Sequence, residues 1–305
     1  DVDGTAPDGV KRTLVGQTCG SAPPGSWLQG AANNQRDSAA ATSPRKVIVR
    51  RNESAFNHAC PMPNAIPTTA QVCDLCGSPH YRVFARRGRH GARLTTVICE
   101  VCGLVYTNPR ASEEDNAAFY HHDYWGQYKN QTEPDDRFFR RRLPKIKPLL
   151  AELQPLLKPG LVVLEVGCSV GALLSQLKEA VGESGRVIGI EAHEGHARFA
   201  RKKKGLDVRA GLLHEVAPEL AAGSFDLVVM NHVLEHTTSP VETVTALKQL
   251  MRTDATLVIE VPNIEAPGSR LSHFFHQAHH FCFSPLTLRR LAQKTGLAVR
   301  RIEAL

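Results

Sequence analysis

The sequence lacks long apolar runs and is poor in aromatic residues, which make up 6% of its 305 residues. No apolar run approaches the roughly 18 residues of a membrane-spanning helix, so we expect no membrane partner. Residues 1–4 carry neither the basic nor the apolar segment of a secretory signal, and we therefore expect a cytoplasmic protein. With 42% hydrophobic residues, the chain can bury one large core and a small second domain.

The sequence also lacks a continuous basic stripe, although its formal net charge is +7. Its basic residues form short, separate clusters at 86–89, 140–142 and 202–204. Solvated surfaces, or attraction to an anionic small substrate, explain this distribution more simply than a nucleic-acid partner does. We therefore expect no nucleic-acid partner, and keep RNA binding as an alternative.

Cysteine is scarce, and four of the eight cysteines form two C-x-x-C pairs, each followed by glycine. In such knuckles the glycine lets backbone N–H groups point at sulfur. Strand-like segments at 81–84 and 94–98 lie between the pairs, as a zinc ribbon requires. In a chain without an export signal this spacing indicates metal and not disulfides. The pattern predicts a structural zinc site, with no position left open for chemistry, formed by Cys73, Cys76, Cys99 and Cys102.

The most informative stretch is 161–177, which reads as a strand, a glycine turn and a helix. Gly167 and Gly171 bracket the turn, where backbone N–H groups can approach a ligand closely. A dinucleotide turn requires glycine at the position that Ser169 occupies. The carboxylate of Glu165 would repel phosphates but suits the cationic amino-acid end of S-adenosylmethionine. The turn therefore favours S-adenosylmethionine, with an NAD-dependent sugar-modifying enzyme as the less favoured alternative.

Further strands follow in the order of a doubly wound, mostly parallel, Rossmann-like α/β sheet. Glu191 ends the apolar run 186–190, about 20 residues after the glycine turn, which is the offset of a ribose-binding carboxylate in such folds. Asn231 follows the apolar run 224–230. Ligands bind beyond the carboxyl ends of parallel strands, so we expect these two residues and Glu165 to face one crevice. The remaining predicted strands are 207–209, 256–261 and 297–302, with helices beginning near 193, 239 and 284.

These patterns divide the chain into four parts. Residues 1–68 have no sustained period and are predicted to be a disordered tail. Residues 69–110 form the zinc ribbon. Residues 111–158 are a helical linker that covers substrate, with helices broken at Pro144, Pro148 and Pro155. The α/β domain comprises residues 159–305; folds of this type are expected to have one more antiparallel strand, for which these residues leave no segment.

Two segments are rich in polar rings, one before the α/β domain and one within it. Tyr120, Tyr124, Trp125 and Tyr128 either cover a substrate or pack between ribbon and core, and the sequence leaves both open. The histidine-rich segment 273–283 carries four imidazoles in 273–280. We favour a substrate lid for it over a metal site, because no ligand other than Cys282 accompanies the histidines.

The motifs together resemble class I S-adenosylmethionine-dependent methyltransferases: residues 164–171 match their first motif, 190–191 the acidic end of the second strand, and 231–236 an N-x-L-E-H signature. The cysteine pairs, followed by Gly-Leu-Val-Tyr-Thr-Asn-Pro, are similar to methyltransferases of sugar and polysaccharide biosynthesis. The resemblance implies a small-molecule acceptor, such as a sugar nucleotide, methylated on oxygen or carbon. It implies that the cofactor is held by Glu165, Gly167, Cys168, Ser169, Gly171, Glu191, Ala192, Leu212, Asn231 and His232. It implies that substrate is held or deprotonated by Tyr120, Tyr124, Glu235, His236 and His280.

A base is required because the acceptor must lose a proton to the protein during methyl transfer. We hypothesise that His236 is this base, and that Glu235 orients it or binds sugar hydroxyls. Alternatively, the Glu-His pair only caps the turn before the next helix. Two rival functions remain beside the NAD enzyme: a nucleic-acid methyltransferase or binding module that grips RNA through the ribbon, and a scaffold without catalytic activity.

Overall fold

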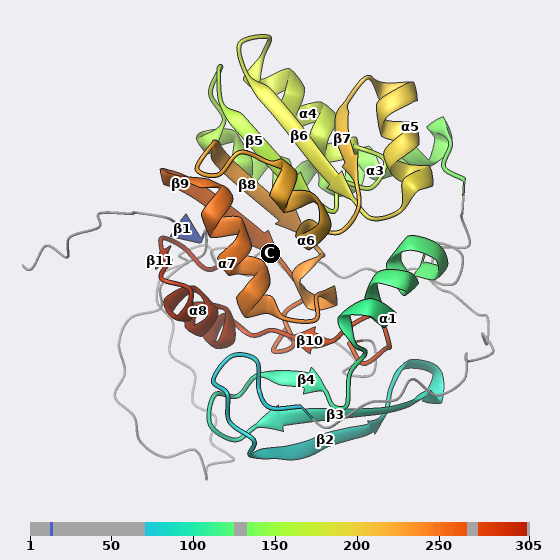
Figure 1. Cartoon of the computed structure of the whole chain (residues 1–305), viewed down its shortest axis with the longest axis vertical. Helices are drawn as coiled ribbons and strands as arrows, with labels where there is room; N and C mark the ends of the chain where they lie inside the picture. The colour runs from blue at the N-terminus through green and yellow to red at the C-terminus, as the bar shows by residue number, and fades with distance from the viewer. Residues whose placement is uncertain (1–12, 15–70, 125–132, 267–273, 304–305) are drawn as a thin grey trace, which may run out of the picture.

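Two β-sheets organise the protein in a computed structural model that describes residues 13–14, 71–124, 133–266 and 274–303 (Figure 1). In Figure 1 the larger sheet lies above and the smaller one below. The larger sheet has the strand order β11 (Ala298–Val299), β1 (Thr13–Leu14), β9 (Met251–Glu260), β8 (Phe225–Asn231), β5 (Val162–Val166), β6 (Arg186–Glu191) and β7 (Asp207–Ala210).

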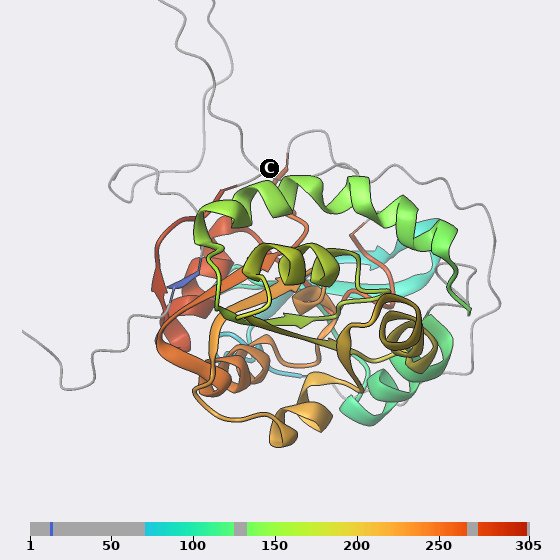
Figure 2. The same cartoon turned by 90° about the horizontal axis from the view of Figure 1, so that it is seen from above.

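Every pairing between described strands of the larger sheet is parallel. Its central strands are almost continuous apolar runs because both faces are covered by helices. Helices α3 (Asp136–Leu153), α4 (Ala172–Val181) and α5 (Glu194–Lys204) cover one face. Helices α6 (Leu213–Val216), α7 (Pro240–Leu250) and α8 (Pro285–Lys294) cover the other. Figure 2 shows α3 on the opposite side of the sheet from α6 and α7. The predicted Rossmann-like α/β fold is confirmed.

Helix α3 corrects the prediction that prolines break this segment. Pro144 and Pro148 both lie inside one continuous helix. Each proline removes a backbone hydrogen bond, but the apolar side of the helix is buried against the α4 side of the core, and this burial keeps the helix intact. Pro155 does end it, in the short 3-10 turn η3 (Gln154–Leu156). The buried residues of α3 are Ile146, Leu149 and Leu153.

Strand β1 corrects the predicted tail at two residues. Thr13 and Leu14 pair with β9 on one side and with β11 on the other. The composition of residues 1–68 could not predict strand β1. Its pairing uses backbone groups of strands that are distant in the sequence, and it requires no apolar periodicity. The rest of the segment 1–68 lies outside the described residues, as do Trp125, Tyr128 and His273.

The smaller sheet has the order β10 (Phe281–Cys282), β4 (Val105–Thr107), β3 (Arg93–Cys99) and β2 (Tyr81–Arg87), with all pairings antiparallel. The strands β2 and β3 form the hairpin that the ribbon prediction requires. Strand β10, however, comes from the histidine-rich segment. Its Phe281 packs against Tyr106 of β4, with ring centroids 6.3 Å apart. Part of the segment that we assigned to a lid therefore completes the ribbon.

Side chains also tie the cysteine knuckles to the α/β domain. The carboxylate of Asp74 accepts hydrogen bonds from the Ser239 hydroxyl (2.7 Å) and the Val241 N–H (3.0 Å), at the start of α7. Arg290 of α8 donates to the carbonyl of Cys102 at 2.5 Å. These contacts fix the first knuckle to α7 and the second to α8.

The segment between the sheets forms α1 (Glu113–Ala118), which Ser112 caps, and continues into the π-helical turn η2 (Phe119–Asp123). The remaining 3-10 turns are η1 (Arg89–Gly91), η4 (Ala217–Glu219) and η5 (Leu234–His236). Among the described helices, none combines the length and the apolar character needed to cross a bilayer.

Candidate active site

Three predicted cofactor ligands lie on one face of the sheet, at its carboxyl edge. In the strand register Glu165 of β5 lies opposite Gly189 of β6 and Val229 of β8. Glu191 and Asn231 each follow two residues later on their strands. Because side chains alternate along a strand, both point to the same face as Glu165, the face that α3, α4 and α5 cover.

This face contains two buried acceptor atoms without a donor. Glu165 is 4% exposed, and its Oε2 has no hydrogen-bond partner, nor has Oδ1 of Asn231. Burial raises the pKa of Glu165 to about 8, and the charge of Glu191 adds to the shift, while the Arg142 guanidinium of α3 opposes it. Unpaired buried acceptors are costly, so these atoms are suited to a ligand that brings N–H donors or positive charge.

The carboxylate of Glu191 holds the two loops on either side of it. Its Oε2 accepts from the backbone N–H of Ser169 at 2.8 Å, and its Oε1 accepts from that of His193 at 3.0 Å. The side chain therefore fixes the glycine turn relative to the loop after β6. A carboxylate oxygen can accept more than one hydrogen bond, so this position is still suited to ligand hydroxyls.

The glycine turn has the backbone geometry that the sequence indicates. Gly167 has φ +76, and a Cβ there would lie 2.3 Å from Cγ2 of Val233. Ser169 also has a positive φ, 53°, which few residues other than glycine adopt. Its N–H bond to Glu191 and the 3.2 Å contact of its Oγ with Nδ1 of His196 hold it in this conformation. Side-chain and backbone contacts thus take the place of the glycine that dinucleotide turns have.

Gly171 and Cys168, the other predicted cofactor residues of this turn, have different surroundings. Gly171 has φ +78, and a Cβ there would lie 2.4 Å from Cδ1 of Leu206. The Cys168 thiol packs into the core over Gly189, where burial raises its pKa well above the usual value. Its side chain therefore fills space beneath the turn and does not face the carboxyl edge.

Ala192 and Leu212 are connected through the side chains of His121 and Glu215, and the sequence did not predict this connection. The carbonyl oxygen of Ala192 lies 3.0 Å from Nδ1 of His121, and the other ring nitrogen lies 3.2 Å from Oε1 of Glu215. The Glu215 carboxylate also accepts from the N–H of Leu212 at 2.6 Å. His121 in the aromatic turn η2 thus joins the loops after β6 and β7. Its position beside Tyr120 was the only signal for it in the sequence.

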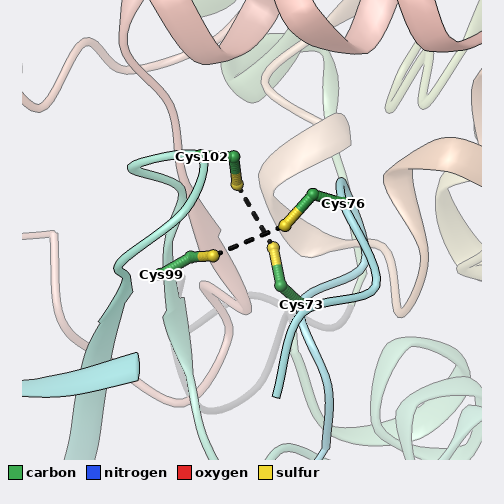
Figure 3. Close-up of side chains that lie close together, drawn as sticks. All are labelled: Cys73, Cys76, Cys99 and Cys102. Atoms are coloured by element: carbon green, nitrogen blue, oxygen red, sulfur yellow. Dashed lines mark hydrogen bonds between the residues drawn. The ribbon is translucent and has the colours of Figure 1, made fainter. Parts of the chain in front are cut away.

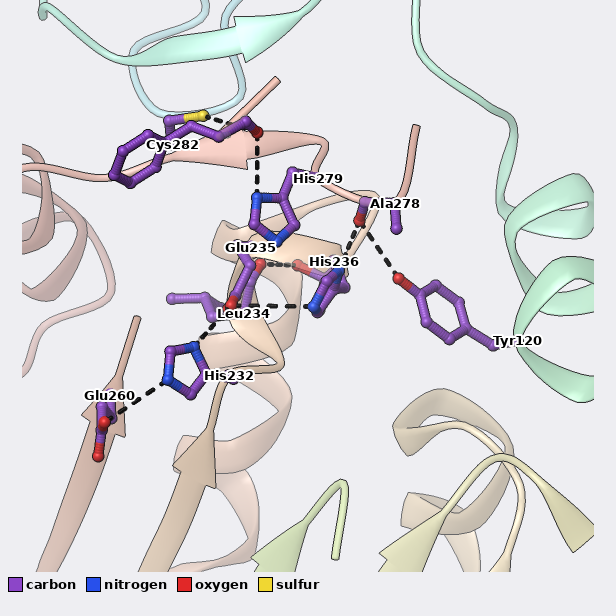
Figure 4. A network of polar contacts seen from close by, with 11 residues as sticks. Tyr120, His232, Leu234, Glu235, His236, Glu260, Ala278, His279 and Cys282 are labelled. Carbon is purple, nitrogen blue, oxygen red and sulfur yellow. Dashed lines mark hydrogen bonds and ion pairs between the residues drawn. The ribbon is translucent and has the colours of Figure 1, made fainter. Parts of the chain in front are cut away.

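The loop after β8 is built around the carboxylate of Glu235, which is 1% exposed. Nδ1 of His232 lies 3.2 Å from its Oε1, and Nε2 of His232 lies 3.6 Å from Glu260 of β9 (Figure 4). Burial alone would lower the pKa of His232, but the two carboxylates outweigh it and raise that pKa to about 9. Burial would raise the pKa of Glu235, yet His236 and His232 hold it below its usual value. Glu235 is therefore an anion at neutral pH.

His236 is held in one tautomer beside the predicted tyrosines. Its Nδ1 lies 2.5 Å from the carbonyl oxygen of Ala278. A carbonyl only accepts, so Nδ1 carries the proton, and in a neutral ring the lone pair is on Nε2, which lies 3.8 Å from Glu235. The rings of Tyr120 and Tyr124 lie 5.7 and 5.9 Å from the imidazole, and the Tyr120 hydroxyl donates to Ala278 at 3.2 Å. The structure brings these predicted residues together, and Figure 4 shows Tyr120, Glu235 and His236 among them.

His280 lies apart from this group of rings. Its Nε2 is 2.8 Å from the side-chain oxygen of Asn116 in α1, and its backbone N–H donates to the carbonyl of Glu235. Burial lowers its pKa to about 3, so the ring stays neutral. These contacts hold α1 against the loop that contains Glu235.

The four paired cysteines converge on one point (Figure 3). The sulfurs of Cys73 and Cys102 are 3.4 Å apart, those of Cys76 and Cys99 are 3.5 Å apart, and all four lie within 4.8 Å of one another. Tetrahedral zinc with Zn–S bonds of about 2.3 Å places sulfurs about 3.8 Å apart. Burial raises the pKa of Cys73, and that of Cys102 to about 11, so a cation is needed to keep four thiolates together. The donor set and spacing fit zinc.

Comparisons with known proteins match the α/β part of the chain. A family profile described as a methyltransferase domain matches residues 138–302. The nocamycin O-methyltransferase of Saccharothrix syringae is 38% identical over 95 residues, which cover 30% of this chain and 32% of that protein. An uncharacterized 37.1 kDa protein in transposon TN4556 of Streptomyces fradiae is 28% identical over 156 residues, covering 47% of this chain and 45% of that protein. The chain thus spans less than half the length of these two relatives.

Among solved structures, a SAM-dependent methyltransferase from Archaeoglobus fulgidus aligns with a TM-score of 0.44 and 22% identity, over 57% of this chain and 72% of that chain. A TM-score of this size carries no argument about function. The family match is therefore the finding on which a functional assignment can be built.

Proposed function

Because the chain belongs to the methyltransferase domain family, we propose that it transfers the methyl group of S-adenosylmethionine to a small-molecule acceptor. The observation that carries this proposal is the pair of buried acceptors, Glu165 Oε2 and Asn231 Oδ1, that lack donors. The α-ammonium group of S-adenosylmethionine brings N–H donors and positive charge. A dinucleotide would bring phosphates to a carboxylate that already carries an unfavourable charge interaction with Glu191.

The remaining cofactor contacts follow from the loops at the same edge. Glu191 can hold ribose hydroxyls while it keeps the backbone N–H groups of Ser169 and His193. The glycine turn, with Cys168 beneath it, lets the ligand approach the backbone at Gly167 and Gly171. We assign the adenine ring to the loops that His121 joins, where it would contact Ala192 and Leu212. We assign His232 to the wall of the cofactor site next to Asn231.

His236 is the group that we assign to the acceptor. When bound, S-adenosylmethionine supplies a methyl group that its sulfonium makes electrophilic. The protein must then align a nucleophile and accept its proton. The carbonyl of Ala278 fixes His236 with its lone pair on Nε2, and the buried anion Glu235 stabilises the imidazolium that forms. Tyr120 and Tyr124 cover this position, while His280 acts as a positioning residue through Asn116.

We further propose that the acceptor carries a hydroxyl group and that it is a sugar or sugar nucleotide. Support for oxygen methylation comes from the relatives named O-methyltransferase. Support for a sugar comes from the resemblance of the cysteine pairs and the segment after them to methyltransferases of sugar biosynthesis. Tyrosine, histidine and carboxylate side chains are also suited to binding several hydroxyls at once.

We propose that zinc is bound by Cys73, Cys76, Cys99 and Cys102 and has a structural role. All four positions of a tetrahedral ion are filled by protein, so the ion has no open position for a substrate. Its role is to hold the two knuckles, which Asp74 and Arg290 connect to α7 and α8.

The cofactor assignment is tested by equilibrium dialysis against S-adenosylmethionine and NAD. The wild-type chain is expected to retain S-adenosylmethionine and not NAD. Gly167→Ala is expected to lose binding, because its Cβ would lie 2.3 Å from Val233. Gly182→Ala is the matched control: Gly182 also has a positive φ, but a Cβ there meets nothing within 4 Å. Retention of NAD alone would refute the proposal.

The base assignment is tested by His236→Asn. We expect turnover to fall by about 10²–10⁴-fold, since general base catalysis is lost, with affinity for S-adenosylmethionine unchanged. His80→Asn, at an exposed position of the ribbon, is expected to keep full activity. A fully active His236→Asn variant would show that this histidine is not the base.

The zinc assignment is tested by metal analysis of the purified chain. We expect about one zinc ion per chain, and its loss in Cys76→Ser, since four thiolates are required to close the site. Cys282→Ser changes a buried cysteine outside the cluster and is expected to keep the ion. Equal zinc content in wild type and Cys76→Ser would contradict a four-cysteine site.

A further inference from the structure

A second group of side chains with metal-ligating atoms lies beside the proposed acceptor position. Glu235 and His236 come from η5, and His279 comes from the histidine-rich segment just before β10. One ligand atom from each lies within 4.8 Å of the other two. Figure 4 shows the His279 ring pointing toward the carboxylate of Glu235.

Both imidazoles are oriented in the way that metal-binding histidines require. Nδ1 of His236 lies 2.5 Å from the carbonyl oxygen of Ala278, and Nδ1 of His279 lies 3.1 Å from that of Phe274. Backbone carbonyls accept and cannot donate, so both Nδ1 atoms carry protons. In the neutral rings the lone pairs are on the two Nε2 atoms. A carbonyl that receives the second ring N–H is the usual outer contact of a histidine that binds metal.

The carboxylate between these rings has one oxygen without a hydrogen-bond partner. Glu235 is 1% exposed, and its Oε1 contacts His232, whereas its Oε2 has no donor. The His232 ring serves Oε1 only, and a buried carboxylate oxygen with neither a donor nor a cation beside it is unfavourable. This observation is independent of the histidine orientations, and it indicates a cation at the same point.

We propose that Glu235, His236 and His279 form a second metal site, for a divalent first-row transition ion. Two imidazoles and one carboxylate suit such ions, whereas magnesium and calcium prefer oxygen ligands throughout. Three protein ligands leave further coordination positions open, in contrast to the closed cysteine site. The ion occupies the same nitrogen of His236 that accepts a proton in the proposed mechanism, so ion and proton exclude each other there. This site follows from the placement of the ligand atoms and the unpaired Glu235 oxygen, and it does not depend on methyl transfer.

The alternative is an ion pair without metal. If His236 carries a second proton, its Nε2–H faces Glu235 Oε1 at 3.8 Å, and the pair needs no ion. That arrangement uses the His279 ring for packing and for its bond to Phe274 only, and it leaves Oε2 of Glu235 without a donor. The two cases differ in whether His279 contributes to metal affinity.

The test is calorimetric titration of the full-length chain, carrying one zinc ion per chain, with nickel chloride. We expect one site that His279→Gln and Glu235→Gln each weaken at least about tenfold, and nickel is expected to raise the melting temperature of wild type but not of the variants. His214→Gln is the matched control, because His214 pairs with Glu113 at the surface (3.1 Å) without a third ligand. It should bind nickel as wild type does.

Two results would overturn the second site. One is a wild-type chain that binds no nickel at micromolar concentration. The other is a His279→Gln variant that binds nickel as tightly as wild type, which would place the ion elsewhere or support the ion pair. If Glu235→Gln fails to fold, His279→Gln still decides the question, because His279 is only half-buried. Neither result bears on S-adenosylmethionine binding, which the dialysis experiment measures separately.

Discussion

The burial of the Glu165 carboxylate is the constraint on which the rest of the site depends. The strand register places it on the same sheet face as Glu191 and Asn231, beneath helices that exclude water. Burial there raises the pKa of Glu165, the charge of Glu191 adds to the shift, and Arg142 and a backbone hydrogen bond at Leu174 partly offset it. The protein accepts this cost at the carboxyl edge of its sheet, where ligands of parallel α/β folds bind. A cationic ligand stabilises the ionised form of the buried Glu165, and this attraction contributes to the affinity for the ligand. This is the physical reason for assigning S-adenosylmethionine to the carboxyl edge of the sheet.

The smaller sheet contributes to this site through the segment it shares with the α/β domain. Strand β10 completes the ribbon, and the residues directly before it place the Ala278 carbonyl and the His279 ring beside His236. The cysteine knuckles are in turn held to α7 and α8 by Asp74 and Arg290. The zinc ion that we propose for the four cysteines would therefore support the loop around His236 through β4 and β10.

Local patterns predicted the parts of the site that local geometry determines. The turn at Gly167 and the cysteine knuckles each depend on a few neighbouring residues. The same is true of Glu165 and Glu191, the two acids at the carboxyl ends of β5 and β6. The contacts of His121 with Ala192 and Glu215, and of His279 with its neighbours, join segments far apart in the chain, and no spacing rule indicates such pairs. The same reason explains β1 and β10, whose partners are distant strands. For helix α3 the local signal was present but misleading. Two prolines predicted breaks in the helix, and burial of its apolar side outweighed their effect.

The most direct test of the central claim is the number of protons released when S-adenosylmethionine binds. Calorimetry at pH 7 in buffers of different ionisation heat gives this number. A Glu165 pKa of about 8 means that the carboxyl is mostly protonated at pH 7, and a bound cation must drive that proton off. We predict release of close to one proton at pH 7 in the wild type and almost none in Glu165→Gln. Equal binding heats in all buffers, with unchanged affinity in Glu165→Gln, would contradict the account.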